Sequence, residues 1–286
     1  MKTLGVVANT TKPRAAEVVK RVRRKAAQLD LSLCGDEATA GLLDSLRGLP
    51  LAAMLEEVDA VMALGGDGTM LRAVREFGGA DKPVIGVNIG GLGFLTSVAE
   101  EELDHALECL ATDDFEVVSG TILVATVERN HEEIARYHAL NDVVVTRGPA
   151  SRPITLDVAV GGNPLTSYLC DGLILATPVG STGHALSAGG PILAPQTPAF
   201  VICPICPHTL SSRPLVVPDS SEICMTGCEP GDEKMLAADG QVGQPLEPED
   251  CVFVRRSKRS ARFIRLPGYS YYAVLRQKLH WSGSHR

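Results

Sequence analysis

The sequence predicts two domains of different class, an α/β domain followed by a mostly β domain. The first third of the chain alternates short apolar runs with amphipathic segments, which is typical of a parallel sheet covered by helices. Beyond residue 115 the chain changes to β-rich runs that are punctuated by turn residues. The length of 286 residues suffices for both domains, since one ordinary domain takes roughly 150 residues.

The elements of the first domain, residues 1–115, follow from its apolar spacing. In residues 15–29 the apolar side chains stand at positions 18, 19, 22, 26 and 29, which is the spacing of an amphipathic helix. The same kind of pattern predicts helices at residues 70–77 and 100–111. Strands are predicted at the short apolar runs of residues 4–9, 58–64 and 84–88.

The second domain, residues 116–258, is predicted from strand candidates and a hairpin signal. Residues 116–160 are rich in β-forming residues, and VGGNPL at 160–165 has the glycines of a hairpin turn. Further strand candidates are the runs at residues 172–176, 200–204, 222–226 and 251–255. Near the end of the chain, residues 275–281 predict a short helix.

Charge and hydropathy exclude several classes of protein. The chain has 34 Asp and Glu against 27 Lys and Arg, and its net charge of −7 argues against a general nucleic-acid binder. No apolar run approaches the ~20 residues of a membrane span, and the N-terminus lacks the apolar core of a signal peptide. We therefore expect a cytoplasmic protein with no membrane or nucleic-acid partner, whose eight cysteines are thiols.

Two interpretations are open for Cys203 and Cys206. Their C-x-x-C spacing is half of a structural zinc site, and Cys224 with Cys228 could supply the other half. Alternatively, residues 198–208 form a buried strand in which cysteine acts as a small apolar residue. We favour the buried strand and expect no metal site.

A glycine-rich turn, GGDGT at residues 65–69, follows the strand predicted at 58–64. Its glycines leave room for a phosphate, and the next helix begins with free N–H groups. Asp67 would stand beside the phosphates, where a carboxylate can accept a proton from a hydroxyl or position Mg²⁺. No Walker A loop is present, and Leu71 stands where a Rossmann motif would need its third glycine. On these five residues alone, an ordinary turn in which Asp67 caps the helix is an equal alternative.

A second polar cluster spans residues 171–191, DGLILATPVGSTGHALSAGGP. Small hydroxylated residues and accessible backbone suit a ligand with many hydrogen-bonding groups, such as a ribose or an adenine. So many glycines cost backbone entropy that a plain core strand would not tolerate. The pair Asn141-Asp142, which ends an apolar run upstream, is by itself more typical of a turn.

Taken together, these segments resemble the NAD kinase family over nearly the whole chain. GGDGT at 65–69 and GGLGFLT at 90–96 resemble the glycine loops of that family, and the 171–191 run is similar to its DGLI-TPTGSTAY-LSAGGP segment. The other similar segments are LNDVVVTRGP at 140–149, PICPHTLSSRPLVVP at 204–218, DGQ at 239–241 and YSYYAVLRQKL at 269–279. GGDGT alone is shared with diacylglycerol-type lipid kinases and phosphofructokinases, so the ordered set of segments carries the resemblance.

The resemblance implies a fold and a reaction. The fold is an α/β nucleotide-type domain and a β-sandwich-like NAD-binding domain, with residues 259–286 returning to pack on the first. The reaction transfers the γ-phosphoryl of ATP, or of polyphosphate, to the 2′-hydroxyl of the adenosine ribose of NAD, and the product is NADP. Mg²⁺ would bridge the ATP phosphates. Family members are commonly homodimers or homotetramers, so we expect a homo-oligomer.

The resemblance also assigns roles to residues. Asp67 would be the catalytic base, and Gly68 would present backbone to the ligand. Asn141 and Asp142 would hold the adenosine, Asp171 would contact the nicotinamide side, and Gln241 would close the site. The residues that would wrap the adenine and ribose are Thr182, Gly183, His184, Ala185, Leu186 and Ser187. Arg72, at a position where the family commonly has a basic residue, is a candidate partner for a phosphate, and Arg152 is a further candidate for NAD binding.

The chain departs from the family pattern at several positions. The family Glu after Asn is Asp142 here, one methylene shorter. TPTGSTAY is TPVGSTGH here, so that Val179 lacks a hydroxyl, Gly183 replaces Ala and His184 replaces Tyr. The Arg that some members have two residues before their Asp is Leu169 here, and Arg147 or Arg152 could supply the missing cation.

Two alternatives to an NAD kinase remain open at this point. A lipid or sugar kinase would share only GGDGT and would not explain the Gly-Ser-Thr run. An NAD(H)-binding sensor with the same fold and little turnover is favoured by the departures at Asp142 and His184. The intact Asp67 argues for an enzyme, and we therefore predict an NAD kinase.

Overall fold

The computed structural model describes the chain except for residues 78–80, 92, 149–151, 228–232 and 282–286. The chain divides into two compact units. The first unit holds Met1–Ser119 and Ala261–Arg286, and the second holds Gly120–Ser260. Within the described part, no helix is long and apolar enough to cross a membrane.

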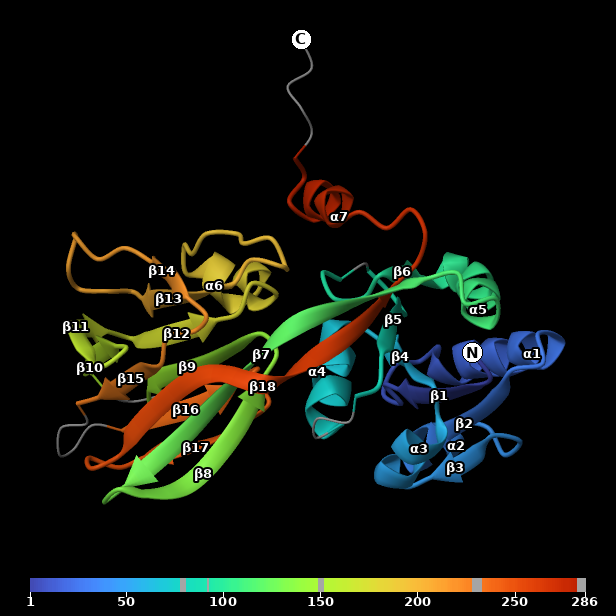
Figure 1. Cartoon of the computed structure of the whole chain (residues 1–286), viewed down its shortest axis with the longest axis horizontal. Coiled ribbons are helices and arrows are strands. Elements are labelled where there is room, and N and C mark those ends of the chain that lie inside the picture. The colour runs from blue at the N-terminus through green and yellow to red at the C-terminus, as the bar shows by residue number, and fades with distance from the viewer. Residues whose placement is uncertain (78–80, 92, 149–151, 228–232, 282–286) are drawn as a thin grey trace, which may run out of the picture. The chain divides into compact units, whose positions relative to one another are not determined.

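A parallel sheet forms the centre of the first unit (Figure 1). Its strands are β1 (Thr3–Ala8), β2 (Ser32–Asp36), β3 (Arg47–Leu49), β4 (Ala60–Gly65), β5 (Val84–Asn88) and β6 (Val98–Ala99). Five of them lie in the order β3-β2-β1-β4-β5, while β6 and the end of β18 (Cys251–Arg265) also pair with β5. All of these pairs are parallel, as the βαβα pattern predicted.

Helices connect most strands of the first unit, and one more helix, α7, follows the last strand of the chain. They are α1 (Ala15–Gln28), α2 (Glu37–Ala40), α3 (Leu51–Glu57), α4 (Asp67–Glu76), the 3-10 helix η1 (Glu100–Glu102), α5 (Leu103–Ala111) and α7 (Tyr271–Lys278). The helix predicted at 15–29 is confirmed as α1. The helix predicted at 275–281 was placed too late, because Ser270 caps α7 by accepting the N–H of Ala273, so that α7 begins at Tyr271.

Both faces of the parallel sheet are covered. On one face, Val18 of α1 and Leu107 of α5 belong to the same buried core as Val6 of β1. On the other face the strands carry glycine where a methionine packs closely. A Cβ on Gly86 would lie 2.8 Å from the sulfur of Met70 on α4. Burial on both faces explains why these strands are continuous apolar runs in the sequence.

The second unit is a β-sandwich. Its strands are β7 (Glu116–Arg129), β8 (Glu132–Ala139), β9 (Asp142–Arg147), β10 (Ile154–Val160), β11 (Asn163–Cys170), β12 (Gly172–Ala176), β13 (Ala199–Ile205), β14 (Leu215–Pro218), β15 (Ile223–Thr226), β16 (Lys234–Ala238), β17 (Val242–Leu246) and most of β18. One sheet has the order β14-β13-β12-β9-β16-β17, and the other contains β11-β10-β15-β18 with β7 and β8. The inner faces share one buried core, to which Leu156, Leu173 and Phe200 belong.

The connections of the second unit match two sequence predictions. Gly161 and Gly162 have φ of +57° and +78° and turn the chain from β10 into its antiparallel partner β11, which confirms the hairpin. Cys203 is fully buried in β13, as the strand interpretation expected, whereas Cys206 is exposed. A short helical segment, η2 (Gly180–Thr182) and α6 (His184–Ser187), follows β12 and packs Ala185 against the outer face of the β12 sheet.

Candidate functional site

The glycine loop GGDGT connects β4 to α4 at the carboxyl edge of the parallel sheet. A Cβ on Gly65 would lie 2.1 Å from the hydroxyl oxygen of Thr69, so this position requires glycine. That hydroxyl accepts a hydrogen bond from the N–H of Gly66 at 3.4 Å. Gly66 faces open space, with no atom within 4 Å of the position that a Cβ would take. The loop therefore presents accessible backbone at a helix N-terminus, which is a favourable place for a phosphate.

The carboxylate of Asp67 is held by the second glycine loop of the first unit. Its Oδ2 accepts the N–H of Phe94 at 2.8 Å, and its Oδ1 accepts the N–H groups of Leu95 at 3.0 Å and Thr96 at 3.2 Å. A Cβ on Gly93 would lie 1.9 Å from Oδ1, so glycine is required for this approach. The two glycine motifs of the sequence thus form a single structure around one half-buried carboxylate.

Other contacts fix the surroundings of Asp67. The hydroxyl of Thr96 accepts hydrogen bonds from Asn88 Nδ2 at 3.0 Å and from the N–H of Gly93 at 3.1 Å. Arg72, on α4, donates to the carbonyl of Ala8 at 3.2 Å and is half-buried. Gly68 is exposed at the start of α4. The Arg72 guanidinium thus lies at the end of β1, beside the loop that was predicted to bind phosphate.

In the second unit, the Gly-Ser-Thr segment lies directly against Asn141. The hydroxyl of Thr177 donates to the carbonyl of Leu140 at 2.6 Å, and the N–H of Thr177 donates to the carbonyl of Asn141 at 2.9 Å. Gly180 comes so close that a Cβ there would lie 2.0 Å from the carbonyl oxygen of Asn141. Two segments that are far apart in the sequence therefore form one polar corner at the ends of β9 and β12.

A third segment, the turn at Asp239, completes this corner. The Asp239 carboxylate accepts the N–H groups of Leu140 at 2.9 Å, Asn141 at 2.7 Å and Asp142 at 3.1 Å. In the DGQ motif, which resembles the family pattern, only Gln241 was expected to have a role, and its side chain is exposed. The missed signal was the Asp-Gly pair, because Asp tolerates the left-handed backbone that Asp239 adopts at φ +52°.

The side chain of Asn141 has an unused acceptor. Its Oδ1 is buried and accepts no hydrogen bond from any residue that the structure describes. A buried polar atom without a partner costs roughly 1–3 kcal/mol, so this oxygen marks a place where the donor of a ligand would be stabilising. An exocyclic amino group, such as that of adenine, is a donor of this kind.

The residues expected to wrap adenine and ribose are arranged around this corner with different exposures. The Thr182 hydroxyl donates to the carbonyl of Val179 at 3.0 Å and is buried. Ala185 is buried, Gly183 and Leu186 are half-buried, and His184 and Ser187 are exposed. A Cβ on Gly183 would lie 3.6 Å from Asn141 Nδ2, so this glycine also borders the corner.

Asp142 is a buried carboxyl group beside a second carboxylate. Its exposed fraction is 5%, and no ion pair or side-chain hydrogen bond joins it to any described residue. Burial, together with repulsion from the Asp239 carboxylate, raises the pKa of Asp142 to about 7. Near neutral pH this carboxyl group therefore exists in both the protonated and the ionised form.

The raised pKa predicts that the contribution of Asp142 to the stability of the fold falls as pH rises. A carboxyl whose pKa is higher in the folded chain stabilises the fold fully at low pH, and this stabilisation is lost as pH rises through about 7. Asp142→Asn removes the titration, so the variant should gain stability over the wild type between about pH 4 and pH 8. Urea unfolding at several pH values measures this gain. Glu249→Gln, an exposed change in the same unit, should follow the wild type, and a parallel profile for Asp142→Asn would contradict the assignment.

Asp171 lies at the other end of the strands from this corner. In the β9–β12 pair Asp142 faces Ala176 and Thr146 faces Gly172, which places the two strand ends roughly 14 Å apart. Asp171 forms an ion pair with Arg147, with Nε and Oδ1 at 2.9 Å. Arg152 is exposed. Within one chain, the structure does not bring Asp171 to Asn141.

Metal-ligating side chains are dispersed. Among the described residues, no group of three or more His, Cys, Asp or Glu side chains is placed to hold a metal ion. Seven cysteines are free thiols, and Cys228, which the zinc interpretation needs as a ligand, lies outside the described residues. Sulfur of the buried Cys203 is 3.5 Å from the carbonyl oxygen of Ala188, beneath α6.

A phosphate-type loop at the carboxyl edge of a parallel sheet, followed by a β unit with a polar corner, is the construction of a nucleotide-binding protein. Comparison with protein families agrees with a nucleotide-binding protein. Residues 4–115 match the model for the ATP-NAD kinase N-terminal domain, and residues 140–266 match the model for the ATP-NAD kinase C-terminal domain. The chain belongs to the NAD kinase family.

Individual relatives are similar over most of the chain. An NAD kinase of Solibacter usitatus is 38% identical over 281 residues, which are 98% of each chain. An NAD kinase of Geobacter sulfurreducens is 44% identical over 223 residues, which are 78% of each chain. These relatives and the family models confirm the resemblance seen in the sequence, and they rule out a lipid or sugar kinase that shares only GGDGT.

Two solved structures have the same fold. The yeast NADH kinase complexed with NADH has a TM-score of 0.89 at 25% identity, and the match covers 100% of this chain and 89% of that chain. An NAD kinase from Archaeoglobus fulgidus in complex with ATP has a TM-score of 0.77 at 25% identity, with 98% and 100% covered. The predicted fold class, an α/β first domain and a mostly β second domain, is confirmed.

Proposed function

We propose that this chain transfers the γ-phosphoryl group of ATP to the 2′-hydroxyl of the adenosine ribose of NAD and so produces NADP. The observation that carries the proposal is the Asp67 carboxylate, which is fixed by three backbone N–H groups beside a glycine-rich helix N-terminus. The chain's membership of the NAD kinase family supports the reaction class.

Asp67 is the proposed catalytic base. The 2′-oxygen attacks the γ-phosphorus, the bond from this phosphorus to the bridging oxygen breaks, ADP leaves, and the hydroxyl proton passes to Asp67. Phosphoryl transfer depends mainly on positioning and on charge neutralisation. The hydrogen bonds to Phe94, Leu95 and Thr96 hold the carboxylate in one orientation, so that little motion is needed when the proton is transferred.

The GGDGT backbone is proposed to bind phosphate oxygens. Gly66 and Gly68 leave the first turn of α4 accessible, and the positive end of a helix dipole favours an anion there. We propose Mg²⁺ as the divalent ion, which would be bound together with ATP and would supply charge neutralisation for its phosphates. Since no cage of three or more ligating side chains exists among the described residues, the ATP phosphates and water would supply most of its ligands.

The polar corner of the second unit is proposed to bind the adenosine of NAD. The unpartnered Oδ1 of Asn141 would accept the adenine amino group, and Asp142 in its protonated form would donate to the ribose. The segment from Thr182 to Ser187 would surround the base, with the exposed ring of His184 able to stack on it. Gln241 would close this site from the Asp239 turn.

Asp171 and Arg152 are proposed to contact the nicotinamide side of NAD in an assembled oligomer. Asp171 lies roughly 14 Å along the strands from Asn141, which is too far for contact within one small corner. A homodimer or homotetramer would let Asp171 of one copy contact the NAD bound by another copy.

We further propose a cytoplasmic location, where a reducing environment keeps the free thiols reduced.

The direct test is product formation. Purified chain is mixed with ATP, Mg²⁺ and NAD, and NADP is measured with an NADP-specific dehydrogenase. We expect steady NADP formation that depends on both nucleotides. Calorimetric binding of NAD without turnover would contradict the enzyme and favour a sensor, and absence of both would contradict the NAD site as well.

A further inference from the structure

The outer face of α1 is strongly basic in a chain that is acidic overall. Residues 12–25 contain seven Lys and Arg and only one Glu, whereas the whole chain has a net charge of −7. The inner face of α1 buries Val18, Val19 and Val22 against the sheet, so the charged side chains extend from its other faces. This concentration of positive charge makes α1 a local attractor for anions.

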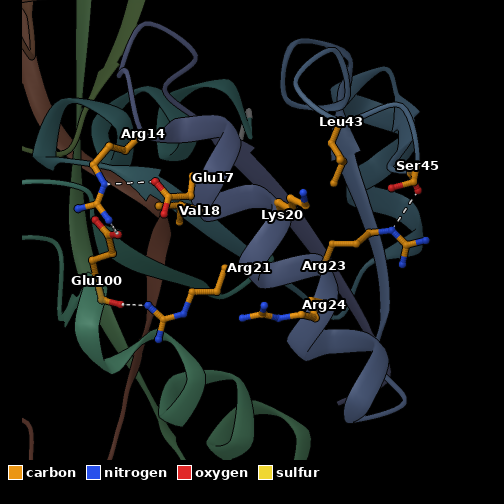
Figure 2. Close-up of a pocket in the computed structure, with 10 residues that line it drawn as sticks. All are labelled: Arg14, Glu17, Val18, Lys20, Arg21, Arg23, Arg24, Leu43, Ser45 and Glu100. Atoms are coloured by element: carbon orange, nitrogen blue, oxygen red, sulfur yellow. Dashed lines mark hydrogen bonds and ion pairs between the residues drawn. The ribbon is translucent and has the colours of Figure 1, made fainter.

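A groove of about 580 Å³ lies along this face of α1 (Figure 2). Leu43 and Ser45 line it from the segment after α2, and Glu100 lines it from the start of η1. The cations that line it are Arg14, Lys20, Arg21, Arg23 and Arg24. A volume of this size is in the range of small-molecule sites, roughly 300–1,000 Å³.

Two of the five cations are already neutralised by carboxylates. Arg14 Nη2 is 2.6 Å from Glu100, and Arg21 Nε is 2.9 Å from Asp104. Figure 2 shows the Arg14 and Arg21 side chains reaching toward Glu100 at one side of the groove. These pairs position the wall of the groove and leave little charge for a ligand.

The other three cations have no carboxylate partner among the described residues. Arg23 Nε donates to the carbonyl of Ser45 at 3.0 Å, a neutral group that leaves the guanidinium charge uncompensated. Lys20 and Arg24 are exposed, and no hydrogen bond or ion pair joins their side chains to the part of the chain that the structure describes. At spacings of three and four residues, the three lie on one side of the helix and repel one another.

We propose that this groove binds a short chain of linked phosphates, either an inorganic polyphosphate or the phosphate tail of a nucleotide, through Lys20, Arg23 and Arg24. The three cations are spread over one turn, ~5.4 Å along the helix, so a ligand with several adjacent charges matches them better than a single phosphate. Arginine forks and a lysine ammonium both favour phosphate oxygens.

The charge distribution favours a small anion over a nucleic acid. Beyond α1 the chain is acidic on average, so a long polyanion that extends out of the groove would be repelled. A short anion meets mainly the basic face, because the two carboxylates that line the groove, Glu17 and Glu100, are both paired with Arg14. None of the residues lining the groove belongs to GGDGT, to residues 93–96 or to the Asn141 corner. The inference therefore does not depend on the proposed reaction.

The test uses the full chain and inorganic triphosphate at low ionic strength. Hydrogen exchange of residues 15–28 reports binding at α1, and calorimetry gives the affinity. The variant Lys20→Gln/Arg24→Gln retains helix-favouring side chains and relieves repulsion, so it should fold. The matched control, Lys2→Gln/Lys258→Gln, removes the same charge from two exposed positions outside the groove.

We expect triphosphate to protect α1 in the wild type and the control, and the affinity at this site to fall at least 10-fold in the Lys20/Arg24 variant. Equal protection by ATP and triphosphate would identify the free phosphate chain as the ligand, and stronger protection by ATP would identify a nucleotide. Equal protection of α1 by triphosphate in the variant and the wild type would overturn the proposal. Protection of α1 by orthophosphate or by duplex DNA, without protection by triphosphate, would also overturn it. Without triphosphate, the Lys20/Arg24 variant should form NADP at the wild-type rate. A failure of the groove proposal can therefore be distinguished from a failure of the proposed reaction.

Discussion

Asp67→Asn should lower kcat for NADP formation by roughly 10²- to 10⁴-fold, the usual contribution of a positioned general base. The amide cannot take the proton of the 2′-hydroxyl. It also replaces one of the two oxygens that accept N–H groups from Phe94, Leu95 and Thr96. The effect therefore includes the loss of proton transfer and a looser loop around the reacting hydroxyl.

Measuring kcat and KM separately distinguishes these two losses. If the base is what matters, kcat falls by orders of magnitude while the KM for NAD changes only a few-fold. Asp36→Asn is a matched control, because the Asp36 carboxylate also accepts a backbone N–H, that of Thr39 at 3.0 Å, in the same unit. The control should keep wild-type turnover. An Asp67→Asn variant with wild-type kcat would contradict the assignment of Asp67 as the base.

Gly180→Ala should abolish most NAD binding and destabilise the second unit by about 1–3 kcal/mol. The new Cβ would lie 2.0 Å from the carbonyl oxygen and 2.6 Å from the Cα of Asn141. Both atoms belong to the backbone, so no side-chain rotation relieves the overlap. The Asn141 corner must shift, and the unpartnered Oδ1 shifts with it.

Gly183→Ala is the matched control, three residues further along the same segment. A Cβ there would have the carbonyl oxygen of Gly180 at 3.3 Å and Asn141 Nδ2 at 3.6 Å, which small movements can accommodate. The family pattern also carries Ala at this position. Calorimetric titration with NAD should show at least a 10-fold loss of affinity for Gly180→Ala and less than about a 2-fold loss for Gly183→Ala. Urea unfolding measures the accompanying loss of stability in each variant. Equal effects of the two variants would contradict the packing argument.

Much of the fold was predictable because its signals are local. The apolar positions of residues 15–29 specify a helix face, and the runs near 60 and 84 specify strands that are buried on both sides. The C-terminal helix was misplaced because its start depends on the Ser270 cap, a contact of a single side chain. The hairpin at Gly161-Gly162 was predictable because two glycines in sequence determine its turn.

The site was predictable in its residue types but not in its contacts. Asp67 stands out in GGDGT, yet its partners are backbone N–H groups 27 to 29 residues away, which no side-chain pattern reveals. The Asp239 carboxylate likewise accepts hydrogen bonds from backbone N–H groups that lie 97 to 99 residues earlier in the sequence. The separation of Asp171 from Asn141 follows from the antiparallel register of β9 and β12, which also lies beyond local sequence.

The central claim is that phosphate moves from ATP to one particular hydroxyl of NAD. The most direct measurement uses ATP labelled in its γ-phosphate and locates the label in the product by phosphorus NMR and mass spectrometry. We predict that the label lies on the 2′-oxygen of the adenosine ribose, in equal amount to the ADP formed. Label released as inorganic phosphate, or attached to another position of NAD, would contradict the account.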